Sequence, residues 1–175
     1  DLTMQIRTPK RHNPAALMIR PAAAANQDAV WAMLEPVFRA GETYVIDPAI
    51  GRDAALAYWY GARTFLAEDG GTPLGTYYLR DNQPGGGAHV CNCGFVTAPA
   101  ARGRGLARGM LAHALDTPTA LGFRAMQFNF VVATNTRAIA TWERAGFDTV
   151  GRLPGAFRHP QDGYVDALVM YRSLV

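Results

Sequence analysis

The sequence lacks any long apolar run. Apolar residues make up 49% of its 175 residues, but charged residues and prolines interrupt them throughout, and a membrane span needs about eighteen in succession. We therefore expect no membrane-spanning segment. The start of the chain also lacks the charged, apolar and cleavage regions of a secretory signal, which favours a cytoplasmic location.

The sequence also lacks a large excess of positive or negative charge. Seventeen lysines and arginines against fourteen acidic residues leave a formal net charge of +3. The basic residues are mostly arginines, and they are scattered or placed at one turn. Nucleic-acid binding normally requires a clustered basic face, so we expect no nucleic-acid partner.

Cysteine is nearly absent. Cys91 and Cys93 alternate with His89 in one β-prone stretch, which places three soft ligands on one side of a strand. A zinc site needs a fourth ligand and usually wider spacing, and a disulfide across one extended residue is strained. We expect no metal and interpret both cysteines as small buried apolar residues.

The length predicts a single domain with a real core. Residues 1–16 contain two prolines and no periodic pattern, and we expect them to form a flexible N-terminal arm. The domain itself is then residues 17–175.

The segment 95–109 is typical of a strand, a tight turn and the start of a helix. Pro99 cannot continue a ladder, and an apolar helical pattern runs from Gly103 onwards. Gly103 and Gly105 let a ligand approach the backbone, and the first helical amides have no intrahelical partners. The helix dipole favours an anion there, so we predict a diphosphate-binding turn supported by nearby cations: Arg102, Arg104 and Arg108.

Two common diphosphate sites do not fit this turn. A Walker loop would end in Gly-Lys-Ser/Thr, which is missing. A dinucleotide fingerprint would have Gly or Ala where Arg108 stands, and an acidic residue about twenty positions later. A nucleoside triphosphatase and a dinucleotide-binding enzyme are therefore disfavoured.

The turn instead resembles a signature of the Gcn5-related N-acetyltransferase (GNAT) superfamily. The match is Arg102-x-x-Gly105-x-Ala107, and a second block begins at Asn135 and ends in Gly146-Phe147. In that block Asn135 suits a helix N-cap and Gly146 a left-handed helix end. The resemblance covers about residues 18–175.

The resemblance implies the GNAT fold, an α/β architecture. Its central sheet is mixed and mostly antiparallel, with helices on both faces and a V-shaped splay between two parallel strands. It implies acetyl-CoA as cosubstrate, a possible homodimer, and these cofactor-binding residues: Phe95, Val96, Thr97, Arg102, Gly103, Arg104, Gly105, Leu106, Ala107, Asn135, Ala138 and Trp142. We expect the parallel strands at residues 88–97 and 125–132, joined by a crossover helix.

The other elements follow from local patterns in the sequence. We expect a first strand at residues 18–20, then a helix that Asn26 caps and Pro36 kinks or ends. A loop over 41–51 leads to a helix at 52–60. The remaining predictions are a hairpin over 64–80 that turns at 69–71, a turn at 83–87, the helix after Asn135, and strands near 147–153 and 164–172.

A closer likeness is to the fungal acetyltransferases that act on azetidine-2-carboxylate and other proline analogues. It is carried by residues 89–95, 127–130 and 162–167. The resemblance implies that Asn92 and Asn129 hold the carboxylate of an amino acid. The residues alone leave a backbone partner for each asparagine as an equal alternative. Tyr44 either covers the substrate or packs beside a helix.

Catalytic groups stay unassigned. The transfer needs a neutral amine, a donor to the developing oxyanion and a proton for the thiolate. Amides near Phe95 and Val96 are candidate oxyanion donors. Trp142 stands where the superfamily usually has a tyrosine acid, and an indole is a poor acid. The candidate bases are Glu42, Asp81 and His89, each of which also has a structural interpretation.

The sequence thus predicts an acetyl-CoA-dependent N-acetyltransferase for a small-molecule amine, such as a free amino acid or a proline analogue. A protein or peptide N-acetyltransferase and an inactive acyl-CoA-binding module are the alternatives.

Overall fold

The computed structural model describes residues 17–101, 103 and 105–175. The predicted arm, residues 1–16, and Arg102 and Arg104 lie outside the described residues. Among the helices described, none is long and apolar enough to cross a membrane.

Within the described residues, seven strands form one mixed sheet in the order β1-β2-β3-β4-β5-β7-β6. The β4–β5 pair is parallel and the other neighbours are antiparallel. The strands are β1 (Leu17–Pro21), β2 (Arg63–Asp69), β3 (Thr72–Asp81), β4 (Val90–Thr97), β5 (Ala125–Val132), β6 (Asp148–His159) and β7 (Gly163–Ser173). This confirms the predicted mixed, mostly antiparallel sheet.

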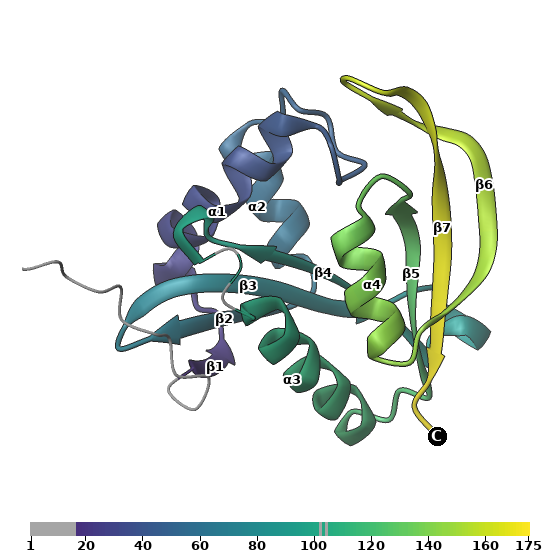
Figure 1. Cartoon of the computed structure of the whole chain (residues 1–175). Coiled ribbons are helices and arrows are strands. Elements are labelled where there is room, and N and C mark those ends of the chain that lie inside the picture. Colours follow the sequence, from purple (N-terminus) through teal and green to yellow (C-terminus); the bar gives the residue numbers. More distant parts are fainter. Residues whose placement is uncertain (1–16, 102, 104) are drawn as a thin grey trace, which may run out of the picture.

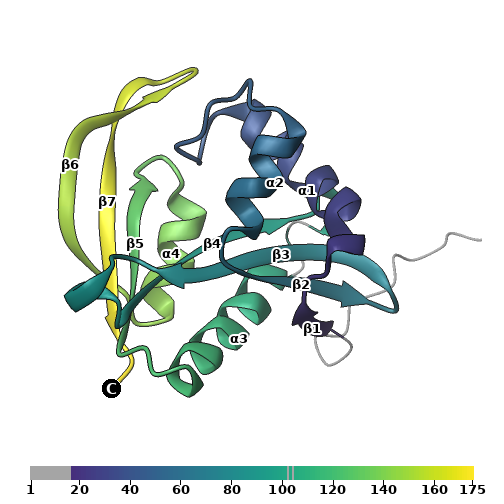
Figure 2. The ribbon, with the colours of Figure 1, turned by 180° about the vertical axis from the view of Figure 1, so that it is seen from behind.

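In the part of the chain that the structure describes, four α-helices cover the two faces of the sheet (Figures 1 and 2). They are α1 (Gln27–Ala40), α2 (Arg52–Tyr60), α3 (Leu106–Ala120) and α4 (Thr136–Arg144). Short 3-10 helices lie at Ala24–Asn26, Gly85–Gly87 and Pro99–Ala101. The order of strands and α-helices agrees with the prediction from the sequence.

Each face of the sheet has its own core. One core joins α1 and α2 to the sheet through residues that include Phe38, Trp59 and Tyr78. The other joins α3 and α4 to it through residues that include Met110 and Trp142. Successive side chains of a strand point to opposite faces, so the sheet contributes to both cores.

The first helix begins where it was predicted to begin but extends past the proline. Pro36 does not end α1, which continues to Ala40 because buried Leu34 and Phe38 keep its apolar face on the sheet across the proline. Gly41, with φ +65°, ends it instead. Asn26 occupies the N-cap position, but its side chain makes no capping bond to the helix.

Strand β6 is longer than the sequence indicated. It was expected to stop near residue 153, where Pro154 and Gly155 follow, but it reaches His159. An irregularity in register between Leu153 and Phe157 accommodates this pair. Strands β6 and β7 form a long arm at one side of the molecule (Figure 1).

The parallel strands β4 and β5 pair only briefly. Their register comprises Val90 with Ala125 and Cys91 with Met126. The pair of Cys91 with Met126 is the last one, and the two strands diverge along their remaining length (Figure 1). The expected V-shaped splay therefore opens after two pairs.

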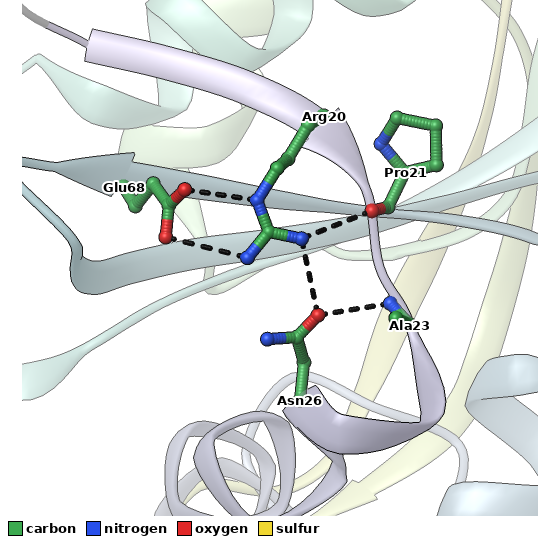
Figure 3. A network of polar contacts seen from close by, with 5 residues as sticks. All are labelled: Arg20, Pro21, Ala23, Asn26 and Glu68. Atoms are coloured by element: carbon green, nitrogen blue, oxygen red, sulfur yellow. Dashed lines mark hydrogen bonds and ion pairs between the residues drawn. The ribbon is translucent and has the colours of Figure 1, made fainter.

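A polar network ties β1, β2 and the start of α1 together (Figure 3). Arg20 Nε donates to Glu68 Oε1 at 2.9 Å, and Arg20 Nη1 donates to Asn26 Oδ1 at 3.1 Å. Asn26 Oδ1 also accepts the Ala23 amide at 2.9 Å. Asn26 therefore serves this network rather than the first turn of α1.

Replacing Arg20 with alanine should lower the free energy of unfolding by about 1 to 2 kcal/mol, because a partly buried carboxylate and an amide oxygen lose their donor. Urea denaturation measures the change. The control is Arg158→Ala in β6, an exposed arginine, for which we expect a change within about 0.5 kcal/mol. Equal effects of the two substitutions would contradict a stabilising role for the network.

Candidate functional site

A cavity of about 1190 Å³ lies along the splay. That exceeds the usual upper size of roughly 1,000 Å³ for a site that binds one drug-sized ligand. Its lining includes every described residue that the sequence assigned to cosubstrate or acceptor binding: Phe95, Val96, Thr97, Gly103, Gly105, Leu106, Ala107, Asn135, Ala138, Trp142, Asn92, Asn129 and Tyr44. Arg102 and Arg104, also assigned, are outside the described residues.

The turn before α3 has the backbone that an anion site needs. Gly103 and Gly105 have φ values of +78° and +74°, and a Cβ on either would meet no atom within 4 Å. Gly105 is the N-cap of α3, so the following amides point out of the helix end. Open space, unpaired amides and the helix dipole together fit a diphosphate.

Cations line the same cavity. Arg108 comes from α3, and Arg137 and Arg144 come from α4. The sequence had suggested only Arg108 of these three. Arg137 could have been predicted from its position two residues after the N-cap Asn135, because both residues line the cavity at the start of α4.

Asn135 caps α4 as the sequence predicted. Its side-chain oxygen accepts the Ala138 amide at 3.4 Å. Gly146 follows α4 with φ +89°, the left-handed conformation that was expected. The cap and the glycine fix both ends of the helix that bounds one side of the cavity.

The backbone of β4 turns alternate residues toward the splay. Val90 O accepts from Asn82 N, and Ala98 N donates to Leu74 O, so even-numbered residues face β3. Odd-numbered Phe95 and Thr97 therefore face the splay, where a bound pantetheine arm would run. The Val96 amide faces β3, which corrects its suggested role as an oxyanion donor.

Tyr44 both packs and lines the cavity. Its ring contacts Phe38 and Trp59, with centroids 5.5 and 6.1 Å away. Its hydroxyl donates to Phe95 O at 2.9 Å. Burial raises the pKa of this phenol, so Tyr44 remains a protonated donor at neutral pH.

Asn92 and Asn129 each hold defined partners. Asn92 Nδ2 donates to Gln127 O at 2.9 Å, so this residue has the backbone partner that was the alternative. Asn129 lies where the β5–β7 register is irregular, and its Nδ2 donates to Asn82 Oδ1 at 2.6 Å. An amide nitrogen carries two hydrogens, so each side chain has a second N–H that these bonds do not use.

Aromatic residues beside Asn92 form a wall that the sequence did not reveal. Tyr78 Oη donates to Asn92 Oδ1 at 3.4 Å and lies 3.1 Å from Tyr58 Oη. Gly94 permits this, because a Cβ there would lie 2.5 Å from the Tyr78 ring. The β3–β4 register, which pairs Tyr78 with Gly94, was the missing information.

Arg80 stabilises this wall. Its Cζ lies 4.1 Å from the Tyr78 ring centroid and 4.7 Å from that of Tyr58. Its Nη2 donates to Tyr58 O at 2.9 Å. Among the described residues, its buried Nε has no hydrogen-bond partner.

The structure separates the three candidate bases. Glu42 lines the cavity, whereas Asp81 and His89 are exposed and outside its lining. Trp142 also lines the cavity, and its ring centroid lies 5.4 Å from that of Phe95. Of these three candidates, Glu42 is therefore the one that the position of the cavity favours.

The cysteines are buried and His89 is exposed. In the part of the chain that the structure describes, no three His, Cys, Asp or Glu side chains cluster as metal ligands. Burial raises the pKa of the Cys93 thiol, which therefore stays protonated at neutral pH.

Comparison with known proteins agrees with this geometry. The model of the acetyltransferase (GNAT) family matches residues 29–147. The chain is 32% identical over 148 residues to N-acetyltransferase aca1 of Schizosaccharomyces pombe, which covers 74% of this chain and 71% of that protein.

Solved structures share the fold. A GCN5-related N-acetyltransferase from Kribbella flavida has a TM-score of 0.88 and 42% identity, covering 92% of this chain and 99% of that chain. YncA from Salmonella typhimurium, solved with acetyl-CoA, has a TM-score of 0.79 and 21% identity, covering 91% and 95%. At that lower identity the likeness shows the fold alone.

Replacing Gly105 with alanine should raise the KM for acetyl-CoA about five- to tenfold, because a left-handed alanine costs about 1 to 2 kcal/mol and the turn would shift. A thiol-release assay measures KM. Gly51→Ala is the matched control, since Gly51 has φ −78° and open space at its Cβ. The same KM in both variants would contradict the assignment of the turn.

Proposed function

The chain belongs to the GNAT family of acetyltransferases, and from this premise we propose that its acceptor is the amine of a small free amino acid or amino-acid analogue. Family membership makes it an acetyl-CoA-dependent N-acetyltransferase. The acceptor is the open question, and the polar groups at the cavity wall bear on it.

The observation that carries the proposal is the pair of side-chain amides at the splay. Asn92 and Asn129 both line the cavity, and each has an N–H that its described bonds do not use. Two such donors suit a carboxylate, which accepts through two oxygens. The motif likeness to the proline-analogue acetyltransferases supports the same role.

Electrostatics on this face of the sheet favour an anion. Arg80 pairs with Asn92 in the β3–β4 register, so its guanidinium lies on the face that holds the two asparagines. Its contacts with the rings of Tyr58 and Tyr78 fix it there. A cation on the same face of the sheet as the two asparagines favours the charged form of a bound carboxylate.

A free α-amine also suits a site in which the described residues offer no strong general base, because it loses its proton easily. Its pKa is about 7.7 to 8.0, against about 10.4 for a lysine side chain, so it is more easily neutralised. Glu42, on the loop after α1, is the candidate base and acts directly or through water. Burial raises the pKa values of Tyr44 and Cys93, so both are poor acids for the leaving thiolate, and the general acid stays unassigned.

The test is thiol release from acetyl-CoA with free amino acids and proline analogues, beside their carboxamides and short peptides. We expect turnover of the free acids. Asn129→Ala and Asn92→Ala should each raise the KM of the acid by roughly 10- to 100-fold, because a bond to a charged group is lost.

The control variant is Gln83→Ala, in an exposed turn, which should keep the wild-type KM. Efficient turnover of carboxamides, peptides or polyamines would show that no carboxylate is recognised. An unchanged KM in both asparagine variants would reject the two-amide site while leaving the acetyltransferase intact.

A further inference from the structure

The β4–β5 ladder stops at a definite carbonyl. With Cys91 opposite Met126, and odd-numbered residues of β4 facing β5, the next acceptor on β5 is Gln127 O. In a regular parallel ladder that oxygen accepts the Cys93 amide. The pairing ends before this bond.

The Asn92 side chain occupies the acceptor instead. Its Nδ2 donates to Gln127 O at 2.9 Å, the length of a ladder bond. The Gln127 carbonyl thereby has a donor other than the Cys93 amide. Cys93 itself lines the cavity. A side-chain amide thus replaces a backbone amide at the apex of the splay.

We propose that Asn92 is a positioning residue that ends the β4–β5 ladder and keeps the Cys93 backbone N–H directed into the cavity, where it donates to the thioester carbonyl oxygen. This role concerns the acetyl group and applies to any acceptor amine. Both proposals use the Asn92 side chain, but only the carboxylate proposal involves Asn129, so the two can fail separately.

Neighbouring hydroxyls hold Asn92 in the required orientation. Tyr78 Oη donates to Asn92 Oδ1, which leaves the nitrogen of the amide toward β5. Tyr58 Oη lies 3.1 Å from Tyr78 Oη and supports it. Burial raises the pKa of Tyr78, so its hydroxyl remains a donor.

The chemistry gives the Cys93 amide a defined task. The acceptor nitrogen forms a bond to the acetyl carbon, the C–S bond breaks, its electron pair leaves with sulfur, and the amine proton passes to base or water. Negative charge develops on the carbonyl oxygen during this step, and a preorganised N–H stabilises it. An amide engaged by Gln127 O would not be available.

Nuclear magnetic resonance tests the hydrogen bonds directly, without cosubstrate. We expect no coupling across a hydrogen bond between Cys93 N and Gln127 C′ in the wild-type protein. Asn92→Ala should produce this coupling, because the freed carbonyl takes the Cys93 amide. Gln127→Ala, which keeps the backbone carbonyl, should retain the wild-type pattern.

Kinetics test the consequence. Asn92→Ala should lower kcat about 100-fold at saturating acceptor, the usual effect of losing an oxyanion donor. Acceptor-independent hydrolysis of acetyl-CoA should fall with it. Asn129→Ala should change mainly the KM of the acceptor, which separates this proposal from the carboxylate site.

Two outcomes would overturn the proposal. One is a hydrogen-bond coupling between Cys93 N and Gln127 C′ in the wild-type protein, and the other is a wild-type kcat in the Asn92→Ala variant. If the Asn92→Ala variant does not fold, titration of the wild-type protein with a cosubstrate analogue tests the role of the Cys93 amide. Addition of a non-hydrolysable acetyl-CoA analogue should shift the Cys93 amide proton downfield, and an unchanged shift rejects the role.

Discussion

The site depends on the early end of one parallel ladder. Strands β4 and β5 share two residue pairs, and past Cys91 their backbones face each other unpaired across the splay. Buried backbone groups without partners are costly, so this edge persists only where other groups satisfy them. The Asn92 amide does so for Gln127 O, and the Tyr44 hydroxyl does so for Phe95 O.

Aromatic residues pack on both faces of the sheet beside the splay. On one face, Phe95, Phe128 and Trp142 form a continuous aromatic cluster, with Phe128 and Trp142 centroids 4.7 Å apart. On the other, Tyr44 packs against Trp59, with ring centroids 6.1 Å apart. These rings belong to the cores on the two faces of the sheet, so the strands that border the splay are part of the packed fold.

The sequence predicted the fold well because its signals are local. Gly103 and Gly105 set the turn, Asn135 and Gly146 bound α4, and these positions place the cosubstrate site. Of the two effects expected of Pro36, a kink or a helix end, the end does not occur, because buried Leu34 and Phe38 keep α1 on the sheet across it.

The contacts that could not be predicted from the sequence depend on the register between neighbouring strands. Tyr78 reaches Asn92 only because Gly94 stands opposite it, and Asn92 reaches Gln127 only because the ladder ends there. No periodicity reports which residue of one strand faces which residue of the next. Sequence patterns therefore identified the asparagines as polar residues needing partners, but not their bonds.

The central claim is that the splay after Cys91 and the turn before α3 form one cosubstrate site. Hydrogen–deuterium exchange with and without acetyl-CoA tests it most directly. The account predicts slower exchange in residues 93–97 and 105–108, with the β6–β7 arm unchanged. Protection confined to other segments, or none in β4, would contradict it.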